Sequence, residues 1–165
     1  MWQKHRRPDV AMACNGLLGG LVAITAPCAF VTPAAAGLVG VVAGLLVSLS
    51  VGFLEDRRID DPVGAIAVHG ACGTWGALAV GIFADGSGGV GWNGVGGPVR
   101  GILFGDSGQL AAQAIGILTN IVFSFGAAFL FFTAVERKFG NRVDTDGEVT
   151  GLDAAEMGAD AYPRD

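Results

Sequence analysis

The chain has 165 residues, and only 15% of them are charged, whereas soluble domains carry about 25% charged residues. Its mean hydropathy of +0.55 and its long uncharged runs predict an integral membrane protein rather than a soluble domain. The formal net charge of −5 comes largely from a polar tail after Asp144, and no basic stripe with interleaved aromatic residues suggests nucleic-acid binding.

The first uncharged run, between Asp9 and Glu55, is too long for one membrane helix. As a single helix its roughly 45 residues would extend about 67 Å, twice the thickness of a bilayer core. The stretch TAPCAFVTP lies in its middle, and its two prolines interrupt a helix. The sequence therefore predicts two spans, over residues 10–26 and 33–54.

Two further uncharged segments predict spans over residues 62–84 and 109–135. A glycine-rich, weakly polar loop separates them. Four spans place both ends of the chain on the same side of the membrane. Residues 1–139 are thus expected to form an all-α membrane bundle of four helices, and residues 140–165 a polar tail.

Basic residues are distributed unevenly around these spans. Eight of them lie close to the spans on the side that holds both ends of the chain: Lys4, Arg6, Arg7, Arg57, Arg58, Arg137, Lys138 and Arg142. The opposite side has only Arg100. The positive-inside rule therefore predicts that both ends of the chain are cytoplasmic, in a multi-pass protein of the plasma membrane.

Small residues recur at intervals of four in the first three spans, a spacing that lets helices approach closely. The pairs are Gly16 with Gly20, Gly40 with Gly44, and Ala77 with Gly81. The fourth span instead carries bulky phenylalanines around the helix, as expected of an outer helix that faces lipid and neighbouring helices.

His69 is the only histidine inside a predicted span. It lies about 10 Å of helix rise beyond Pro62, where a charged side chain costs several kcal/mol, so an ionisable residue there is a functional-site hypothesis. A neutral imidazole offers one hydrogen-bond donor and one acceptor and suits a narrow pore for a polar solute or a proton. The alternative is a packing histidine bonded to a neighbouring carbonyl.

A metal site and an enzymatic site are not expected. His69 and Cys72 are three residues apart, on one face of a regular helix, but two ligands are too few for a zinc site. No nucleophile–base pair is apparent, and no cofactor is implied. The three cysteines are widely spaced and do not suggest a disulfide framework.

Asp60 and Asp61 precede Pro62 at the start of the third predicted span. An aspartate before a proline at the first helical position is a favourable N-cap, and carboxylates complement the positive end of a helix. We therefore expect both aspartates to cap this helix, with Arg57 and Arg58 as nearby ionic partners.

Three stretches resemble ammonium transporters of the Amt/Mep/Rh superfamily. They are NGLLGGLVAITAPCAFVTPAAAGLVGVVAG (Asn15–Gly44), DDPVGAIAVHGACGTWGALAVGIFA (Asp60–Ala84) and GLDAAEMGADAY (Gly151–Tyr162). The resemblance implies a fold of eleven membrane helices in two inverted halves, assembled as a homotrimer with one pore per subunit. This chain looks like the C-terminal part of that fold, its last four helices and its cytoplasmic tail.

The resemblance also implies roles for individual residues. In the family, ammonium gives up its proton at an outer vestibule, and the transported species passes a narrow apolar pore lined by two histidines. His69 matches the second histidine, Ala65 and Ile66 match apolar pore-lining positions, and Thr25 falls near the outer pore region. The partner histidine belongs to the family's first half, and Gly64 stands where many members carry an acidic residue.

The tail matches the family's cytoplasmic motif at six positions: Gly151, Leu152, Asp153, Gly158, Ala161 and Tyr162. That segment resembles one that docks on the cytoplasmic face, couples subunits and meets PII-type nitrogen signalling proteins. Two functions remain open at this point. One is transport of ammonium or ammonia for nitrogen uptake, and the other is an ammonium sensor that signals through the tail.

Overall fold

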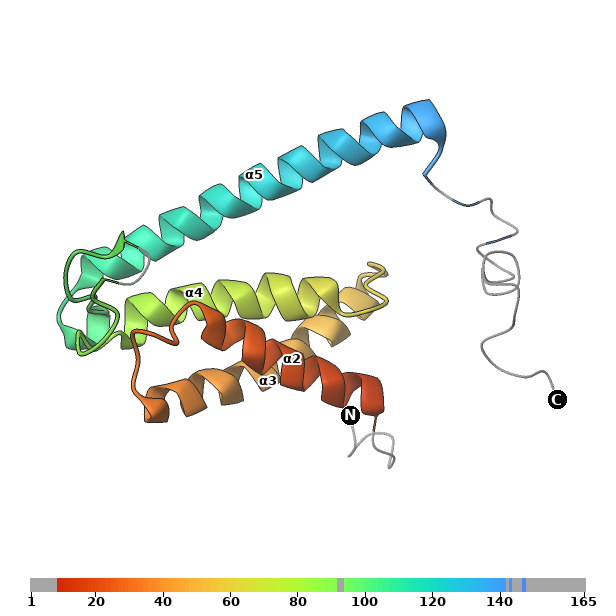
Figure 1. Cartoon of the computed structure of the whole chain (residues 1–165). Coiled ribbons are helices and arrows are strands. Elements are labelled where there is room, and N and C mark those ends of the chain that lie inside the picture. The colour runs from red at the N-terminus through yellow and green to blue at the C-terminus, as the bar shows by residue number, and fades with distance from the viewer. Residues whose placement is uncertain (1–8, 92–93, 142, 144–146, 148–165) are drawn as a thin grey trace. The chain divides into compact units, whose positions relative to one another are not determined.

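The computed structural model describes residues 9–91, 94–141, 143 and 147, and the elements within them are helical (Figure 1). They are α2 (Val10–Thr25), α3 (Pro33–Asp56), the π-helix η1 (Ile66–Ala71), α4 (Cys72–Phe83), the 3₁₀ turn η3 (Ile102–Phe104) and α5 (Ser107–Phe139). The chain divides into two compact units, Met1–Thr119 and Asn120–Asp165. The tail residues singled out above, Gly151 to Tyr162, lie outside the described residues.

Polar caps and prolines set the ends of the first two helices. The Asp9 carboxylate accepts a hydrogen bond from the Met12 N–H (2.9 Å) at the start of α2. Thr32 caps α3 by accepting a bond from the Ala35 N–H (3.3 Å), and a proline follows it at the first helical position. The chain thus reverses between Thr25 and Pro33, in the stretch where the two prolines predicted a break.

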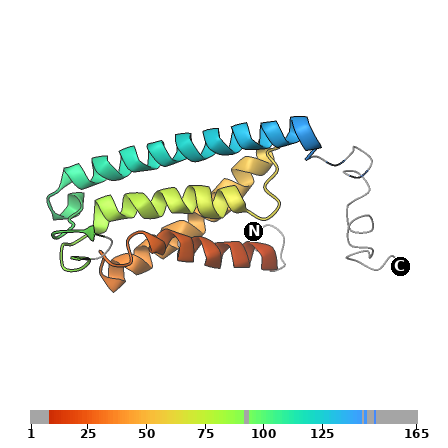
Figure 2. The same ribbon diagram turned by 45° about the horizontal axis from the view of Figure 1, so that its top comes forward.

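α2, α3 and the helix formed by η1 and α4 pack against one another (Figure 2). α2 runs parallel to η1–α4, because Gly64 lies against Asn15 and Gly76 lies against Ala23. Beyond their far ends, the Asp85 N–H donates to the Phe30 carbonyl (3.1 Å). The turn after α2 and the loop after α4 therefore share one end of the unit.

The core between these helices consists of small and β-branched side chains. Its buried members are Ala23, Val39, Ala43, Val47, Val68, Cys72 and Ala79. Close approach depends on glycines, since a Cβ at Gly19 would lie 2.5 Å from Val47 Cγ2 and one at Gly76 would collide with the Ala23 carbonyl. Such contacts hold membrane helices together by van der Waals packing.

Within the described residues, most of the predicted close-packing glycines do not meet a neighbouring helix. A Cβ at Gly16, Gly20, Gly40 or Gly44 would meet nothing within 4 Å, whereas one at Gly81 would lie 2.6 Å from Leu110 Cα. A spacing of four places two residues on one face of a helix but does not say which face meets a neighbour. For that reason the pattern alone does not identify the faces of α2 and α3 that pack within this chain.

α5 is a continuous helix of 33 residues. The Asp106 carboxylate accepts hydrogen bonds from the N–H groups of Gly108 (2.8 Å) and Gln109 (3.3 Å) at its start. Arg137 and Lys138 occupy its last turn, where cations complement the negative end of the helix dipole. None of its residues is buried.

Among the residues that the structure describes, three helices are long and apolar enough to cross a membrane: Pro33–Asp56, Ile66–Phe83 and Ser107–Phe139. α2 is apolar too, but its 16 residues are fewer than the roughly 20 that a span usually needs. Large apolar side chains are widely exposed, among them Leu17 (69%) and Leu49 (69%). The chain is thus a multi-pass, all-α membrane bundle, as its composition predicted.

Candidate functional site

The helix that carries His69 begins later than predicted. Pro62 was expected at the first helical position, but it lies in a turn, and the π-helix begins at Ile66. The Gly64 N–H donates to the Asp61 carbonyl (3.0 Å) to close that turn. Gly64 has a φ of +70°, a conformation that favours glycine, and a Cβ there would lie 2.6 Å from Asn15 Nδ2.

Asp61 binds the exposed N–H groups at the start of the helix. Its Oδ2 accepts hydrogen bonds from the N–H groups of Ile66 (3.0 Å) and Ala67 (3.2 Å). The negative carboxylate also complements the positive end of the helix. Asp60, which was expected to share this role, makes no such bond within the described residues. The Arg57 guanidinium, expected as an ionic partner of the aspartates, instead lies over the Phe53 ring at 4.7 Å.

His69 lies inside the π-helix, one turn after Ala65 and Ile66. A π-turn holds one more residue than an α-turn and so rotates the rest of the helix about its axis, and such turns often mark functional sites. Ala65, Ile66 and His69 are all exposed, whereas Ala67, Val68 and Cys72 are buried. The three predicted pore residues Ala65, Ile66 and His69 therefore lie on one exposed surface at the start of this helix.

Two hydrogen bonds to α3 fix the opposite face of the same helix. The Trp75 indole Nε1–H donates to the Val39 carbonyl (3.0 Å), and the Cys72 thiol donates to the Ala43 carbonyl (3.5 Å). Cys72 thus faces the core while His69 is exposed, so the expected placement of these two side chains on one face is wrong. Among the described residues, no three His, Cys, Asp or Glu side chains gather as metal ligands.

A mainly apolar pocket of about 330 Å³ adjoins this exposed face. It lies between α3 and η1 and is lined by Leu49, Ser50, Phe53, Leu54, Ile66 and Ala71. Ile66, which lines the pocket, is 48% exposed. His69 is not among the residues that line this pocket.

Thr25, the fourth predicted pore residue, lies away from the other three. Its hydroxyl donates to the Val22 carbonyl of its own helix (2.7 Å). Ala23 lies against Gly76, which follows His69 by about 10 Å of helix rise, so Thr25 lies roughly 13 Å beyond His69 along the helix axis. The structure thus brings Ala65, Ile66 and His69 together and leaves Thr25 near the opposite end of the bundle.

The sequence reasoning missed two residues that position His69. Asn15 lies against Gly64 at the turn before η1, and Trp75 anchors α4 to α3. A signal for the first was present, because a glycine two residues after Pro62 is typical of a turn rather than of a helix. The Trp75 bond had no such signal, since its partner is a backbone carbonyl far away in the sequence.

Comparison with known proteins gives a consistent picture. The profile of the Ammonium Transporter Family matches residues 1–162. The chain is 45% identical over 163 residues to ammonium transporter Amt2 of Archaeoglobus fulgidus, a match that covers 98% of this chain and 34% of that protein. It is 33% identical to an ammonium transporter of Bacillus subtilis, over 98% of this chain and 39% of that protein.

Among solved structures, one described as a sensor Amt protein is similar, with a TM-score of 0.75 and 37% sequence identity. The alignment covers 94% of this chain and 36% of that one. The chain therefore spans between about a third and two fifths of the length of these relatives.

Proposed function

The chain belongs to the ammonium transporter family, and on this premise we propose that it supplies one wall of a pore for ammonium or ammonia. The observation that carries the proposal is the exposed face of η1, where His69 lies one turn after Ala65 and Ile66. The chain spans only part of its relatives, and in the proposed pore the other wall comes from segments that this chain does not contain.

The chemistry of this face suits ammonia. An uncharged imidazole has one donor and one acceptor. It can therefore donate a hydrogen bond to the nitrogen lone pair of NH₃ or accept a hydrogen bond from one of its N–H groups. Ala65 and Ile66 offer no polar group, and an ion in such surroundings loses several kcal/mol of solvation. The wall therefore favours NH₃ over NH₄⁺ at this depth, with the proton released before the solute reaches the narrow part of the pore.

The proposed orientation places the Arg57–Asp61 end of the bundle in the cytoplasm of a plasma-membrane protein. The support is the unequal distribution of basic residues: Arg57 and Arg58 lie at that end, while Arg100 forms a backbone bridge with Asp85 at the other. α2, at about 24 Å of helix, serves as the remaining span in this proposal. Thr25 then lies toward the outer mouth of the pore.

The test is ammonium uptake by the full-length transporter in proteoliposomes. We expect His69→Leu, which lacks donor and acceptor, to reduce uptake at least about tenfold, the effect of losing roughly 1.4 kcal/mol along the path. Ser48→Ala is the matched control, because Ser48 is an exposed polar residue whose hydroxyl bonds to its own helix (3.4 Å). Normal uptake by a folded His69→Leu protein would contradict the role of His69.

A second candidate function is ammonium sensing through the tail. Two observations favour it: the similar solved structure is described as a sensor Amt protein, and the tail carries GLDAAEMGADAY. In this version a homotrimer presents its tails, through residues such as Gly151, Asp153 and Tyr162, to a PII-type signalling protein.

Binding of a PII-type protein to the full-length transporter, measured with and without ammonium, separates the two functions. Sensing predicts that ammonium changes this binding even when His69→Leu has stopped transport, and that Tyr162→Ala abolishes the response. Pure transport predicts uptake without any change in binding.

A further inference from the structure

The helix formed by η1 and α4, with the turn before it, keeps one row of residues buried over its whole length. Gly64, Val68, Cys72, Gly76 and Val80 are buried, and they recur at intervals of four. A regular α-helix turns about 100° per residue, so each interval of four advances about 40° around the helix. From Gly64 to Val80 this drift would reach about 160°, and the two ends of the row would face opposite sides.

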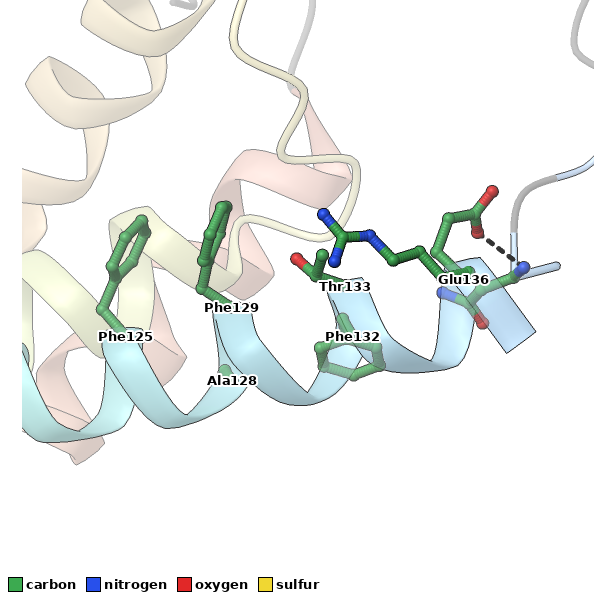
Figure 3. Close-up of a pocket in the computed structure, with 8 residues that line it drawn as sticks. Phe125, Ala128, Phe129, Phe132, Thr133 and Glu136 are labelled. Carbon is green, nitrogen blue, oxygen red and sulfur yellow. Dashed lines mark hydrogen bonds between the residues drawn. The ribbon is translucent and has the colours of Figure 1, made fainter. Parts of the chain in front are cut away.

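α5 shows the spacing of a helix without any such correction. The side chains that line a pocket on its C-terminal half are separated by three or four residues, as in Phe125, Ala128, Phe129 and Phe132 (Figure 3). These intervals follow the turn of a regular α-helix, about 3.6 residues. An unbroken interval of four in η1–α4 therefore needs a local change in how far the helix turns.

The π-helix supplies this change. A π-turn holds one residue more than an α-turn, and so it takes back about 100° of rotation. Over the twelve positions from Gly64 to Gly76, a regular α-helix would leave the two glycines about 120° apart, whereas one surplus residue reduces the difference to about 20°. Both glycines do lie against α2, Gly64 beside Asn15 and Gly76 beside Ala23.

His69 lies within the π-helix, between two segments whose rotation is fixed. Asp61 binds the first N–H groups of the helix, and the Trp75 indole ties α4 to α3. In an uninterrupted α-helix His69, seven positions before Gly76, would point within about 20° of that glycine and thus toward α2. In the structure Gly76 is buried and His69 is exposed.

We propose that the surplus residue of the π-turn positions His69, because it turns the side chain out of the packed face and into the pore wall. This role rests on the proposed function, in which His69 lines that wall. Gly70 directly follows His69 and is exposed. Among the described residues, the one atom within 4 Å of a Cβ at Gly70 is Ile66 Cγ2, at 3.7 Å. Close packing does not hold Gly70 in place, so we assign the surplus to this residue.

Deletion of one residue should convert the π-turn into a regular α-turn, and the site of the deletion decides where the ring points. With Gly70 deleted, Gly76 follows His69 by six positions, and the two point about 120° apart. With Ala67 deleted, seven positions remain, and His69 points within about 20° of Gly76. Either deletion leaves Gly64 and Gly76 about 20° apart, so both glycines still face α2.

The test is thiol modification of the full-length transporter that carries His69→Cys, with serine at the two exposed cysteines and native Cys72 as the buried reference. Methyl methanethiosulfonate is the probe, and mass spectrometry measures the rate. We expect deletion of Ala67 to slow modification at position 69 at least about tenfold, because the side chain turns into the core. Deletion of Gly70 should leave this position reactive. Equal rates at position 69 in the two deletions would overturn the proposal.

A third deletion shows whether the π-turn tolerates the loss of a residue better than a regular helix does. Deletion of Ala77 should rotate Gly81 by about 100° away from Leu110, whose Cα lies 2.6 Å from a Cβ at Gly81. We expect the midpoint of thermal unfolding to fall further for this deletion than for deletion of Gly70. An equal fall would show that the π-turn holds no surplus residue and would also overturn the proposal.

Uptake by the protein with native His69 connects the turn to transport. Deletion of Gly70 should lower ammonium uptake at least about tenfold, because the ring leaves its place in the wall. Gly70→Ala keeps the number of residues and should retain uptake. Normal uptake after the deletion would overturn the positioning role. The thiol rates do not depend on transport, so they test the position of residue 69 separately from the His69→Leu uptake that tests the pore.

Discussion

The two faces of the helix formed by η1 and α4 differ in what they touch. One face packs Val68, Cys72 and Ala79 into the core and bonds to α3 through the Trp75 indole. The other face exposes Ala65, Ile66 and His69. The packed face sets the rotation of the helix, so the exposed face can carry an ionisable ring without weakening the packing of this unit.

The largest effect should come from the packed face. Gly76→Ala places a Cβ against the Ala23 carbonyl, and because backbone must move, we expect a loss of about 3 kcal/mol or more. Gly40→Ala is the control, since a Cβ there meets nothing within 4 Å. Thermal unfolding of the full-length protein in detergent measures the stability of each variant. Equal unfolding midpoints for the two variants would contradict the packing described for α2 and α4.

Changes in the turn that precedes this helix should give the next largest effect. Asp61→Ala removes the bonds to the Ile66 and Ala67 N–H groups, and loss of such a cap costs about 1–2 kcal/mol. Asp60→Ala should cost less than about 0.5 kcal/mol, as for a surface change. Ammonium uptake should fall in Asp61→Ala but not in Asp60→Ala. Equal uptake by the two variants would contradict a positioning role for Asp61.

A smaller effect is expected at Trp75. Trp75→Phe keeps an aromatic ring and removes the bond to the Val39 carbonyl, which should cost about 1 kcal/mol. Chemical denaturation of the full-length protein would detect it as a lower midpoint. Phe83→Leu, which changes the ring next to Trp75 but leaves that bond intact, serves as the control. Unchanged stability of Trp75→Phe would show that the bond does not fix the rotation of the helix.

The smallest effect concerns the loop after α4. The Ser87 hydroxyl and N–H both donate to the Asp85 carboxylate (2.7 and 2.8 Å) and hold the pKa of Asp85 below its usual range. Because the folded pKa is the lower one, this stabilisation is present above about pH 4 and is lost as pH falls through the folded value. Asp85→Asn should therefore flatten, slightly, the acid side of a plot of melting temperature against pH.

Sequence reasoning located the helices because their ends depend on local chemistry. Asp9, the prolines and the uncharged runs placed the helical segments within a few residues of those in the structure, except at Pro62. There the turn at Gly64 makes the helix begin later along the chain. Its first segment is a π-helix, which no hydrophobic pattern specifies.

The histidine of the candidate site was apparent from the sequence, but the packing around it was not. His69 stood out because it is the one histidine in a predicted span. Which glycines pack, and that Cys72 is buried while His69 is exposed, depend on how three helices rotate against each other. That rotation is set by contacts between distant residues, such as Asn15 with Gly64 and Trp75 with Val39, and a single sequence does not reveal them.

The most direct test of a solute path along the His69 face compares the two faces by thiol modification. In the full-length transporter, His69→Cys is combined with serine at the exposed Cys14 and Cys28, and native Cys72 remains as the buried reference. Mass spectrometry then measures modification by methyl methanethiosulfonate. We predict that position 69 reacts at least about tenfold faster than Cys72, because access controls the rate. Equal rates at the two positions would contradict a solute path along this face.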